Sequence, residues 1–441
     1  MSTFTVAIIL FSITYILLFS LPKYRSLIAF ASASVFSVWL SLLSEDVSFN
    51  FNDIIGAIDF NVLMMIFGTM GIVSLFIESK MPMKIADILL SKFKNVRSAI
   101  IAMAVMAGVI SAFIDNVATV LMLAPIALAV CKKQNISPIS SIIAISISSN
   151  LQGAATLVGD TTSILLGSYA NMNFFDFFVF HNKPSIFWAV EIGAFLTVLL
   201  LFFIFRKETQ QLKISEKTVV KDYSPTIIII STVLLLILAS FIKEPSEGFW
   251  NTIYQLRNGI ICLSLLIIGL IINITKNKSL KTAKETLKEI DYDTLLLLAS
   301  LFIIISAITK AGVIDKLSEL LVSVGGNNLL LMYTTIVFAS VLISAFVDNI
   351  PYVLTMLPVM THVASSMNTS PYVLYFGLLV GATLGGNITP IGASANIAGI
   401  GILKKEGHTV KTKDFMKISI PFTLTAVLSG YAIVWLFWGS L

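Results

Sequence analysis

Charged residues are scarce in this chain. Asp, Glu, Lys and Arg make up 12% of its 441 residues, whereas hydrophobic residues make up 57% and the mean hydropathy is +0.93. Soluble domains carry about 25% charged residues, so this composition excludes an ordinary soluble protein. The net charge of +5 reflects how Lys and Arg are distributed among loops, and it indicates no nucleic-acid partner.

Cysteine and histidine are nearly absent. Cys131 and Cys262 are isolated and lie in or beside apolar segments. Two such thiols exclude a disulfide framework and a zinc site. His181, His362 and His408 all lie near predicted loops, where we expect them to be solvated. We therefore expect no cofactor.

Long apolar runs recur along the whole chain, and about 20 apolar residues are enough to span a bilayer. The pattern predicts an all-α polytopic membrane protein with about ten transmembrane helices and two re-entrant helical hairpins. The first run has no charged leader and no small-residue cleavage site after it, so we expect a first span rather than a signal peptide. The expected spans are about 4–21, 27–43, 60–78, 139–170 (interrupted), 185–205, 225–242, 258–274, 293–309, 371–402 (interrupted) and 416–438.

The basic residues predict the orientation in the plasma (inner) membrane. With the loop at Lys23 and Arg25 in the cytoplasm, 24 of the 29 basic residues fall on the cytoplasmic side, as the positive-inside rule requires. No Lys or Arg is then left for the hydrocarbon core. The five expected outside are Lys183, Lys243, Arg257, Lys310 and Lys316.

One polar segment occurs twice. Ser111–Asn116 returns 233 residues later as Ser344–Asn349, and eight of sixteen positions are identical over 111–126 and 344–359. Each copy lies in a long apolar stretch, where a carboxylate costs roughly 2.5–3.5 kcal/mol on insertion scales. The two stretches, about 98–130 and 329–361, are predicted to be the re-entrant hairpins. Each carries an Asp-Asn pair near its middle, which indicates an ion or substrate site at a repeat interface.

The duplication divides the chain into two halves. Residues 1–205 and 225–441 each hold five spans and one hairpin, and 206–224 forms a charged cytoplasmic linker. An odd number of crossings inverts the second half relative to the first, which is the layout of many secondary transporters. Segments 80–97 and 310–325 are amphipathic and are expected to lie along the membrane interface before each hairpin.

Both interrupted spans contain glycine-rich breaks. Asn150–Asp160 lies in the first, and Gly381–Gly392 in the second. Glycine and proline break helices, and the freed carbonyls then suit a cation while half-helix N-termini suit an anion. The alternative for Asp160 is a cap on the helix that begins near Ser163, and Glu191 is expected to have an interfacial or packing role. The candidate ion- or substrate-binding residues are Asp115, Asn116, Asn150, Thr156, Gly159, Asp160, Asp348, Asn349, Asn387, Thr389, Ser394 and Asn396, with a sodium ion placed near Asp115 and Asp348.

The order of these motifs resembles the ion transporter superfamily. The similarity is to its arsenite-permease and NhaD-type sodium/proton antiporter branch, which includes the melanocyte P protein. Asp115-Asn116 followed by Thr156–Asp160 matches the first half of that pattern, and Asp348–Pro351 followed by Gly385–Asn396 matches the second. Relatives often follow Gly-Asp with Pro-Pro-Asn, whereas this chain has Thr161-Thr162-Ser163. The divalent-anion/sodium symporters carry Ser-Asn-Thr at their hairpin tips, which this chain lacks.

These observations predict a secondary transporter that works by alternating access and exchanges a small inorganic ion or metalloid, such as arsenite, for protons or sodium. Sodium/proton exchange fits the same residues, and a sodium-coupled di- or tricarboxylate transporter is a further alternative. A channel or an intramembrane aspartyl protease would also contain buried acids, although a protease needs a Gly-x-Gly-Asp turn that Leu157–Asp160 does not provide. The lipid bilayer and a small solute are the expected partners, and a homodimer is compatible with the sequence.

Overall fold

The computed structural model describes residues 2–42, 47–134, 136–211, 218–245, 248–326 and 328–439. Almost all regular structure in this part of the chain is helical, and one two-stranded sheet pairs β1 (Val179–Phe180) with β2 (Lys183–Pro184). The all-α membrane fold class is thereby confirmed. Part of the predicted linker, residues 212–217 with Lys213 and Lys217, lies outside the described residues.

The first half of the chain forms ten helices within the described residues, and the loop before α2 forms a short 3-10 turn at Pro22–Tyr24. The helices are α1 (Thr3–Ser20), α2 (Arg25–Leu42), α3 (Phe51–Ala57), α4 (Phe60–Glu78), α5 (Met81–Leu90), α6 (Val96–Ser111), α7 (Asn116–Lys133), α8 (Ile139–Gly153), α9 (Thr161–Tyr169) and α10 (Ile186–Ile204), with a second 3-10 turn at Phe175–Phe177.

The second half follows the same plan. Helix boundaries from α15 to α20 lie 232 or 233 positions after those of α4 to α9, to within one or two residues for all but the C-terminal end of α20. The helices are α11 (Ser224–Ala239), α12 (Phe249–Gln255), α13 (Arg257–Asn277), α14 (Lys281–Glu289), α15 (Tyr292–Lys310), α16 (Val313–Gly325), α17 (Leu329–Ser344), α18 (Asn349–Ser366), α19 (Tyr372–Gly385), α20 (Ser394–Lys405) and α21 (Thr412–Trp438).

Eight described helices are long and apolar enough to cross a membrane, namely α1, α2, α4, α7, α10, α13, α15 and α21, taking α2 together with its preceding 3-10 turn. The two interrupted spans are each broken into a pair, α8 with α9 and α19 with α20. The predicted span at 225–242 is the shorter helix α11. The count differs from the ten expected spans because glycine-rich breaks divide two runs and α11 is short. In the other direction, α7, which is expected as one arm of a hairpin, is long enough to be counted.

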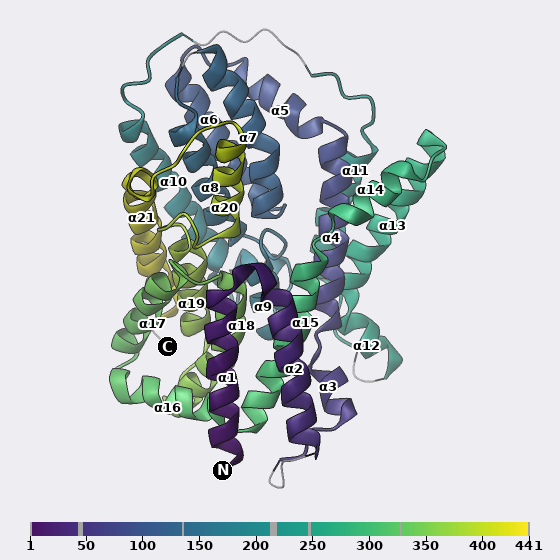
Figure 1. The fold of residues 1–441 in the computed structure, drawn as a ribbon, viewed down its shortest axis with the longest axis vertical. Coiled ribbons are helices and arrows are strands. Elements are labelled where there is room, and N and C mark those ends of the chain that lie inside the picture. The colour runs from purple at the N-terminus through teal and green to yellow at the C-terminus, as the bar shows by residue number, and fades with distance from the viewer. Residues whose placement is uncertain are drawn as a thin grey trace.

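The predicted hairpins are helix–turn–helix units. Asn95 begins α6 by accepting a 2.8 Å hydrogen bond from the Ser98 N–H, and Asn328 begins α17 by accepting one of 3.1 Å from the Leu331 N–H. These matched caps satisfy orphan donors of the first turn in each helix. Figure 1 shows the first hairpin, α6 with α7, in the upper part of the molecule and the second, α17 with α18, in the lower part, so the hairpins approach the centre from opposite ends.

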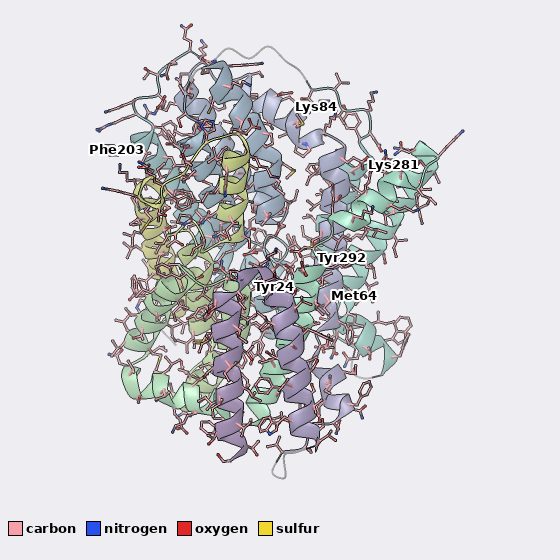
Figure 2. The ribbon with its side chains drawn as sticks, viewed as in Figure 1. Tyr24, Met64, Lys84, Phe203, Lys281 and Tyr292 are labelled. Carbon is pink, nitrogen blue, oxygen red and sulfur yellow. The ribbon has the colours of Figure 1, made fainter. Side chains whose placement is uncertain are left out.

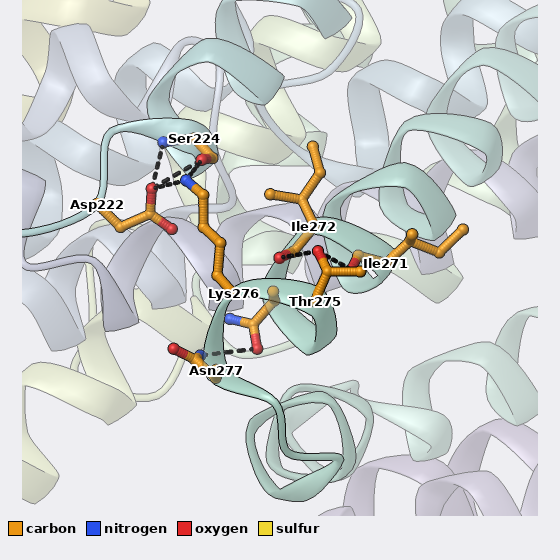
Figure 3. Close-up of polar contacts among 8 residues, drawn as sticks. Asp222, Ser224, Ile271, Ile272, Thr275, Lys276 and Asn277 are labelled. Atoms are coloured by element: carbon orange, nitrogen blue, oxygen red, sulfur yellow. Dashed lines mark hydrogen bonds and ion pairs between the residues drawn. The ribbon is translucent and has the colours of Figure 1, made fainter.

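The helices pack in matched pairs. Helix α2 lies along α15, and α13 lies along α4, while α6 packs on α8 and α17 on α19. Near the upper end, Lys276 donates a 2.7 Å hydrogen bond to Asp222, which joins the end of α13 to the start of α11 (Figure 3). Burial raises the pKa of Asp222, but hydrogen bonds from Lys276 and Ser224 outweigh it and leave that pKa below its ordinary value.

Candidate functional site

The site begins at the hairpin tips, where an aspartate caps the second helix of each hairpin. One carboxylate oxygen of Asp115 accepts hydrogen bonds from the N–H groups of Val117 (3.0 Å) and Ala118 (3.1 Å). Asp348 accepts one from the N–H of Ile350 at 3.1 Å. A single oxygen performs the capping in each case, so the other oxygen is available to a ligand or a basic partner.

Asn116 anchors the first tip to a broken span, whereas Asn349 is bonded within its own hairpin. The Asn116 amide donates to Asn150 Oδ1 at 3.0 Å, and the Asn150 amide donates to the Thr383 carbonyl at 2.7 Å. Asn150 and Thr383 are 233 positions apart, so this buried bond joins equivalent residues of the two halves. In the other hairpin, Asn349 Oδ1 accepts a hydrogen bond from Ser344.

The break between α8 and α9 presents a third carboxylate. Asp160 is the N-cap of α9 and is buried. It accepts hydrogen bonds from the Thr161 N–H at 2.8 Å and from the Thr162 hydroxyl at 3.0 Å. The equivalent position before α20 is Ala393, which offers no side-chain cap. The two halves therefore place a carboxyl group on one side of the site only.

Both breaks press against the hairpin tips at a glycine. A Cβ added to Gly159 would lie 2.6 Å from the carbonyl oxygen of Gly153, 2.7 Å from that of Ser111 and 2.9 Å from that of Ala112. At Gly392 the three equivalent oxygens would lie 2.6, 2.9 and 2.7 Å away. Real Cβ atoms do not approach oxygen this closely, so glycine lets the break lie directly on the tip.

Two predicted threonine ligands have a structural role at these contacts. The Thr156 hydroxyl donates to the carbonyl of Ala112, and the Thr389 hydroxyl donates to that of Ala345. Both hydroxyls fasten a break to its tip, and neither residue lines the main cavity described below.

The predicted asparagines of the second break also lie behind the cavity wall. The Asn387 amide donates to the Ile147 carbonyl at 3.0 Å, which again links the two halves. The Asn396 amide donates at 3.2 Å to the carbonyls of Gly386 and Thr389. The side-chain oxygens of both asparagines are buried and have no hydrogen-bond partner among the described residues.

One cavity of about 440 Å³ is lined by residues from both hairpin tips and both breaks, and we call it the central cavity. A second cavity of about 290 Å³ shares Ile77 and Leu121 with it and runs between α5 and α7 toward Lys133. The central cavity therefore leads toward the end of the molecule where Lys84 lies in Figure 2. Seven predicted site residues line it: Asp115, Asn116, Asn150, Asp160, Asp348, Asn349 and Ser394.

A basic residue also reaches the central cavity, and the expectation that no Lys or Arg does so is wrong. Arg25 lines the cavity and forms an ion pair with Asp348, and the side chains of both residues are 27% exposed. The turn between α1 and α2 lies near mid-height, where Figure 2 labels Tyr24, rather than at the end of the molecule. An arginine beside Lys23 in a short loop between two spans resembles an ordinary cytoplasmic anchor, so no sequence pattern indicated that Arg25 lines the cavity.

Two further acids in the cavity wall were also missed. Glu289 ends α14 and accepts a hydrogen bond from Ser74, and Asp291 is the N-cap of α15. Both precede a span and resemble loop residues in the sequence. The described wall thus holds five carboxyl groups, from Asp115, Asp160, Glu289, Asp291 and Asp348, and one guanidinium group.

This arrangement suits a small cation or an exchangeable proton. Carboxylate and amide oxygens are the donors that hard cations prefer. Among the described residues, no three His, Cys, Asp or Glu side chains lie close enough together to hold a metal ion, so a cation here would also need backbone or amide oxygens. Glu191 lies on α10 and does not line the central cavity.

The helical bundle, its two opposed hairpins and the polar cavity buried between them define a multi-pass membrane transporter rather than an enzyme. The chain belongs to the citrate transporter (CitMHS) family, which matches residues 8–381 and 259–441. The family lies in the ion transporter superfamily, so the predicted resemblance is confirmed. Bacterial relatives place such a protein in the plasma membrane.

Relatives agree with this assignment, and a solved transporter structure has a similar fold. A 46 kDa membrane protein of Mycobacterium leprae is 29% identical, with 98% of each chain covered. The P protein of Sus scrofa is 25% identical over 97% of this chain and 58% of its own length. The YdaH transporter of Alcanivorax borkumensis has a TM-score of 0.59 at 13% identity, covering 94% of this chain and 97% of its own. The last similarity concerns the fold alone.

Proposed function

We propose that the chain is a secondary active transporter that moves a small inorganic ion or metalloid by alternating access, coupled to protons or sodium. The observation that carries this proposal is the central cavity, where Asp115 and Asp348 come from hairpins of opposite halves. A buried site at a repeat interface, flanked by broken helices, is the arrangement that such carriers use.

The charges of the cavity favour a cation or a neutral solute. Five carboxyl groups face one guanidinium group, and that group is already paired with Asp348. Two like unit charges about 8 Å apart repel by roughly 2 kcal/mol at an effective dielectric constant of 20. A trivalent anion would meet this repulsion several times over, whereas arsenous acid is uncharged at neutral pH and sodium would be attracted.

We propose further that residues 1–205 and 225–441 are inverted repeats joined by the segment 206–224. Matched helix boundaries support this, as does the exchange of partners in which α2 packs on α15 and α13 packs on α4. When two similar halves of opposite orientation exchange conformations, the protein passes from one access state to the other. The two states then have nearly equal free energies. That near-equality is the physical basis for facing each side of the membrane in turn.

A carboxylate substrate is the second candidate. Arg25 supplies a cation at the cavity, and α20 begins there at Ser394 without a side-chain cap. Free N–H groups at a helix start and a guanidinium are both suited to a carboxylate. The family description also names citrate. For such a substrate, release of Arg25 from Asp348 would be required.

Flux into proteoliposomes with imposed pH and sodium gradients tests the proposal, with sodium, arsenite and citrate supplied separately. We expect gradient-driven movement of sodium or arsenite and no movement of citrate. Asp115→Asn and Asp348→Asn should each abolish coupling, whereas Glu191→Gln, which removes a carboxyl group away from the cavity, should retain it. Transport of citrate alone would indicate the second candidate, a carboxylate transporter. An uncoupled, voltage-driven current would indicate a channel.

A further inference from the structure

A second large cavity lies on the other side of the broken span from the central cavity. It encloses about 650 Å³, and we call it the outer cavity because Arg257, which is expected outside, lines it. The starts of α4 and α13 and the end of α9 form its wall, and the function proposed above assigns it no role. Its polar lining includes Asp59, Asn61, Ser168, Glu244, Arg257 and Asn258.

The outer cavity is the counterpart of the central cavity in the other half of the chain. Arg25 is the first residue of α2, and Arg257, 232 positions later, is the first residue of α13. Asp59 is the N-cap of α4, and Asp291, also 232 positions later, is the N-cap of α15. One arginine and one aspartate of this set line each cavity.

The contacts between the paired helices repeat as well. Beside the central cavity, the Ser26 hydroxyl donates to Asp293 at 2.8 Å, which joins α2 to α15. Beside the outer cavity, the Gly259 N–H donates to Asn61 Oδ1 at 2.8 Å, which joins α13 to α4. Asn61 and Asp293 are again 232 positions apart. The two cavities therefore share the same construction, from helices of exchanged halves.

The two arginines differ in one respect, which is their acidic partner. Arg25 forms an ion pair with Asp348 at the tip of the second hairpin. The Arg257 guanidinium instead stacks over the Tyr254 ring, with its centre 3.8 Å from the ring centroid, and donates to the Tyr254 carbonyl at 2.8 Å. Its Nε atom is buried and has no hydrogen-bond partner among the described residues.

At the tip of the first hairpin, Asp115 has no basic partner among the described residues. The structure shows hydrogen bonds from the Val117 and Ala118 N–H groups to a single oxygen of Asp115, and it assigns the other oxygen no partner in the described chain. An unpaired acid thus lines the central cavity while its expected base lines the outer one. The acid and base of the other half, Asp348 and Arg25, are already joined.

Apolar side chains separate Asp115 from the outer cavity. A small cavity of about 20 Å³ adjoins Asp115 and Asp160 and is closed by Ile66, Val158 and Ile164. Ile164 also lines the outer cavity, together with Met65 and Leu157. The two sides are therefore one layer of side chains apart, and α9 carries part of that layer.

We propose that the outer cavity is the outward-facing position of the transport site, in which Arg257 receives the Asp115 carboxylate as Arg25 receives that of Asp348 in the central cavity. This inference rests on the alternating access proposed above. Each arginine stabilises one of the two conformations by pairing with one hairpin tip. A cation or proton bound at either aspartate competes with the arginine for the same carboxylate, which links occupancy of the site to the change of conformation.

Cysteine labelling from each side of the membrane tests this pairing without any transported solute. Ala118→Cys places a thiol beside Asp115 in the central cavity, and the native Cys131 and Cys262 are buried. A membrane-impermeant maleimide is applied to right-side-out and to inside-out vesicles, and the ratio of outer to inner labelling rates is measured. Arg25→Gln and Arg257→Gln are compared with the exposed controls Lys23→Gln and Lys243→Gln, which remove the same charge nearby.

We expect Arg25→Gln to raise the ratio of outer to inner labelling about twofold to fivefold, because it removes one partly exposed ion pair, and Arg257→Gln to lower the ratio by a similar factor. Arg257→Lys keeps the charge and should return the ratio toward that of the parent protein. Equal or same-direction shifts in the two Gln variants, or shifts no larger than those of the controls, would overturn the pairing. If the pairing fails but the parent protein is labelled from both sides, alternating access still stands. Labelling from the inside alone in every variant would overturn both the pairing and alternating access.

Discussion

Replacing Gly159 by alanine should destabilise the protein, because its Cβ would lie 2.6–2.9 Å from three backbone carbonyl oxygens. Backbone cannot move aside as a flexible side chain can, so the break must shift away from the hairpin tip. Overpacking of this kind costs about 1–3 kcal/mol. Gly401→Ala is the matched control, since its Cβ would meet nothing within 4 Å inside α20 and should gain up to about 1 kcal/mol of helix propensity.

The assay is thermal unfolding of the purified protein in detergent, followed by tryptophan fluorescence at a fixed scan rate. By size scaling, about 1 kcal/mol shifts the apparent Tm of a chain this long by roughly 1 °C, so Gly159→Ala should unfold about 1–4 °C below Gly401→Ala. Gly392→Ala should behave like Gly159→Ala, since the equivalent oxygens surround it within the same range of 2.6–2.9 Å. Equal stability of Gly159→Ala and Gly401→Ala would refute the close contact between break and tip.

Two other predictions concern stability. Asn150→Leu removes both buried hydrogen bonds of that amide and orphans the Thr383 carbonyl, at about 1–3 kcal/mol per orphaned group, so its Tm should fall well below that of the exposed control Asn277→Leu. The hydrogen bond from Lys310 lowers the pKa of Asp53 below its ordinary value of 3.8. The ionised carboxylate therefore stabilises the fold at pH values above that ordinary pKa. This stabilisation is lost as the pH falls through the lower pKa of the folded state. A Tm gap between the parent and Asp53→Asn should therefore close on acidification below about pH 4, and a gap that widened would contradict the pairing.

Local sequence patterns were sufficient to predict the hairpins, the breaks and the acids at the tips. Asp115 and Asp348 stand out because a carboxylate is costly in an apolar run, and the glycines around Gly159 and Gly392 interrupt helices that are otherwise continuous. The same patterns could not show which polar side chains face the cavity. Thr156 and Thr389 lie in the predicted motifs, yet each hydroxyl is used to bond a backbone carbonyl 44 residues earlier in the chain.

Residues brought in by packing between halves were not predictable in this way. Arg25 reaches Asp348 from 323 residues away, and this contact depends on how α1 and α2 lie against the second hairpin. Glu289 and Asp291 enter the wall because α14 and α15 pack beside α4. Hydropathy assigns such residues to loops, since it records the length of an apolar run and carries no information about the depth at which the intervening turn lies.

The presence of Asp160 opposite Ala393 has a consequence for kinetics. A carrier whose halves were identical would offer the same affinity to solute arriving from either face. Under the alternating access proposed above, one carboxyl group on a single side of the site would make the two access conformations bind a cation unequally, so half-saturating concentrations should differ between the cytoplasm and the exterior. The rate constants for reorientation must differ in compensation, because net movement has to cease at the same gradients whichever face the solute enters from.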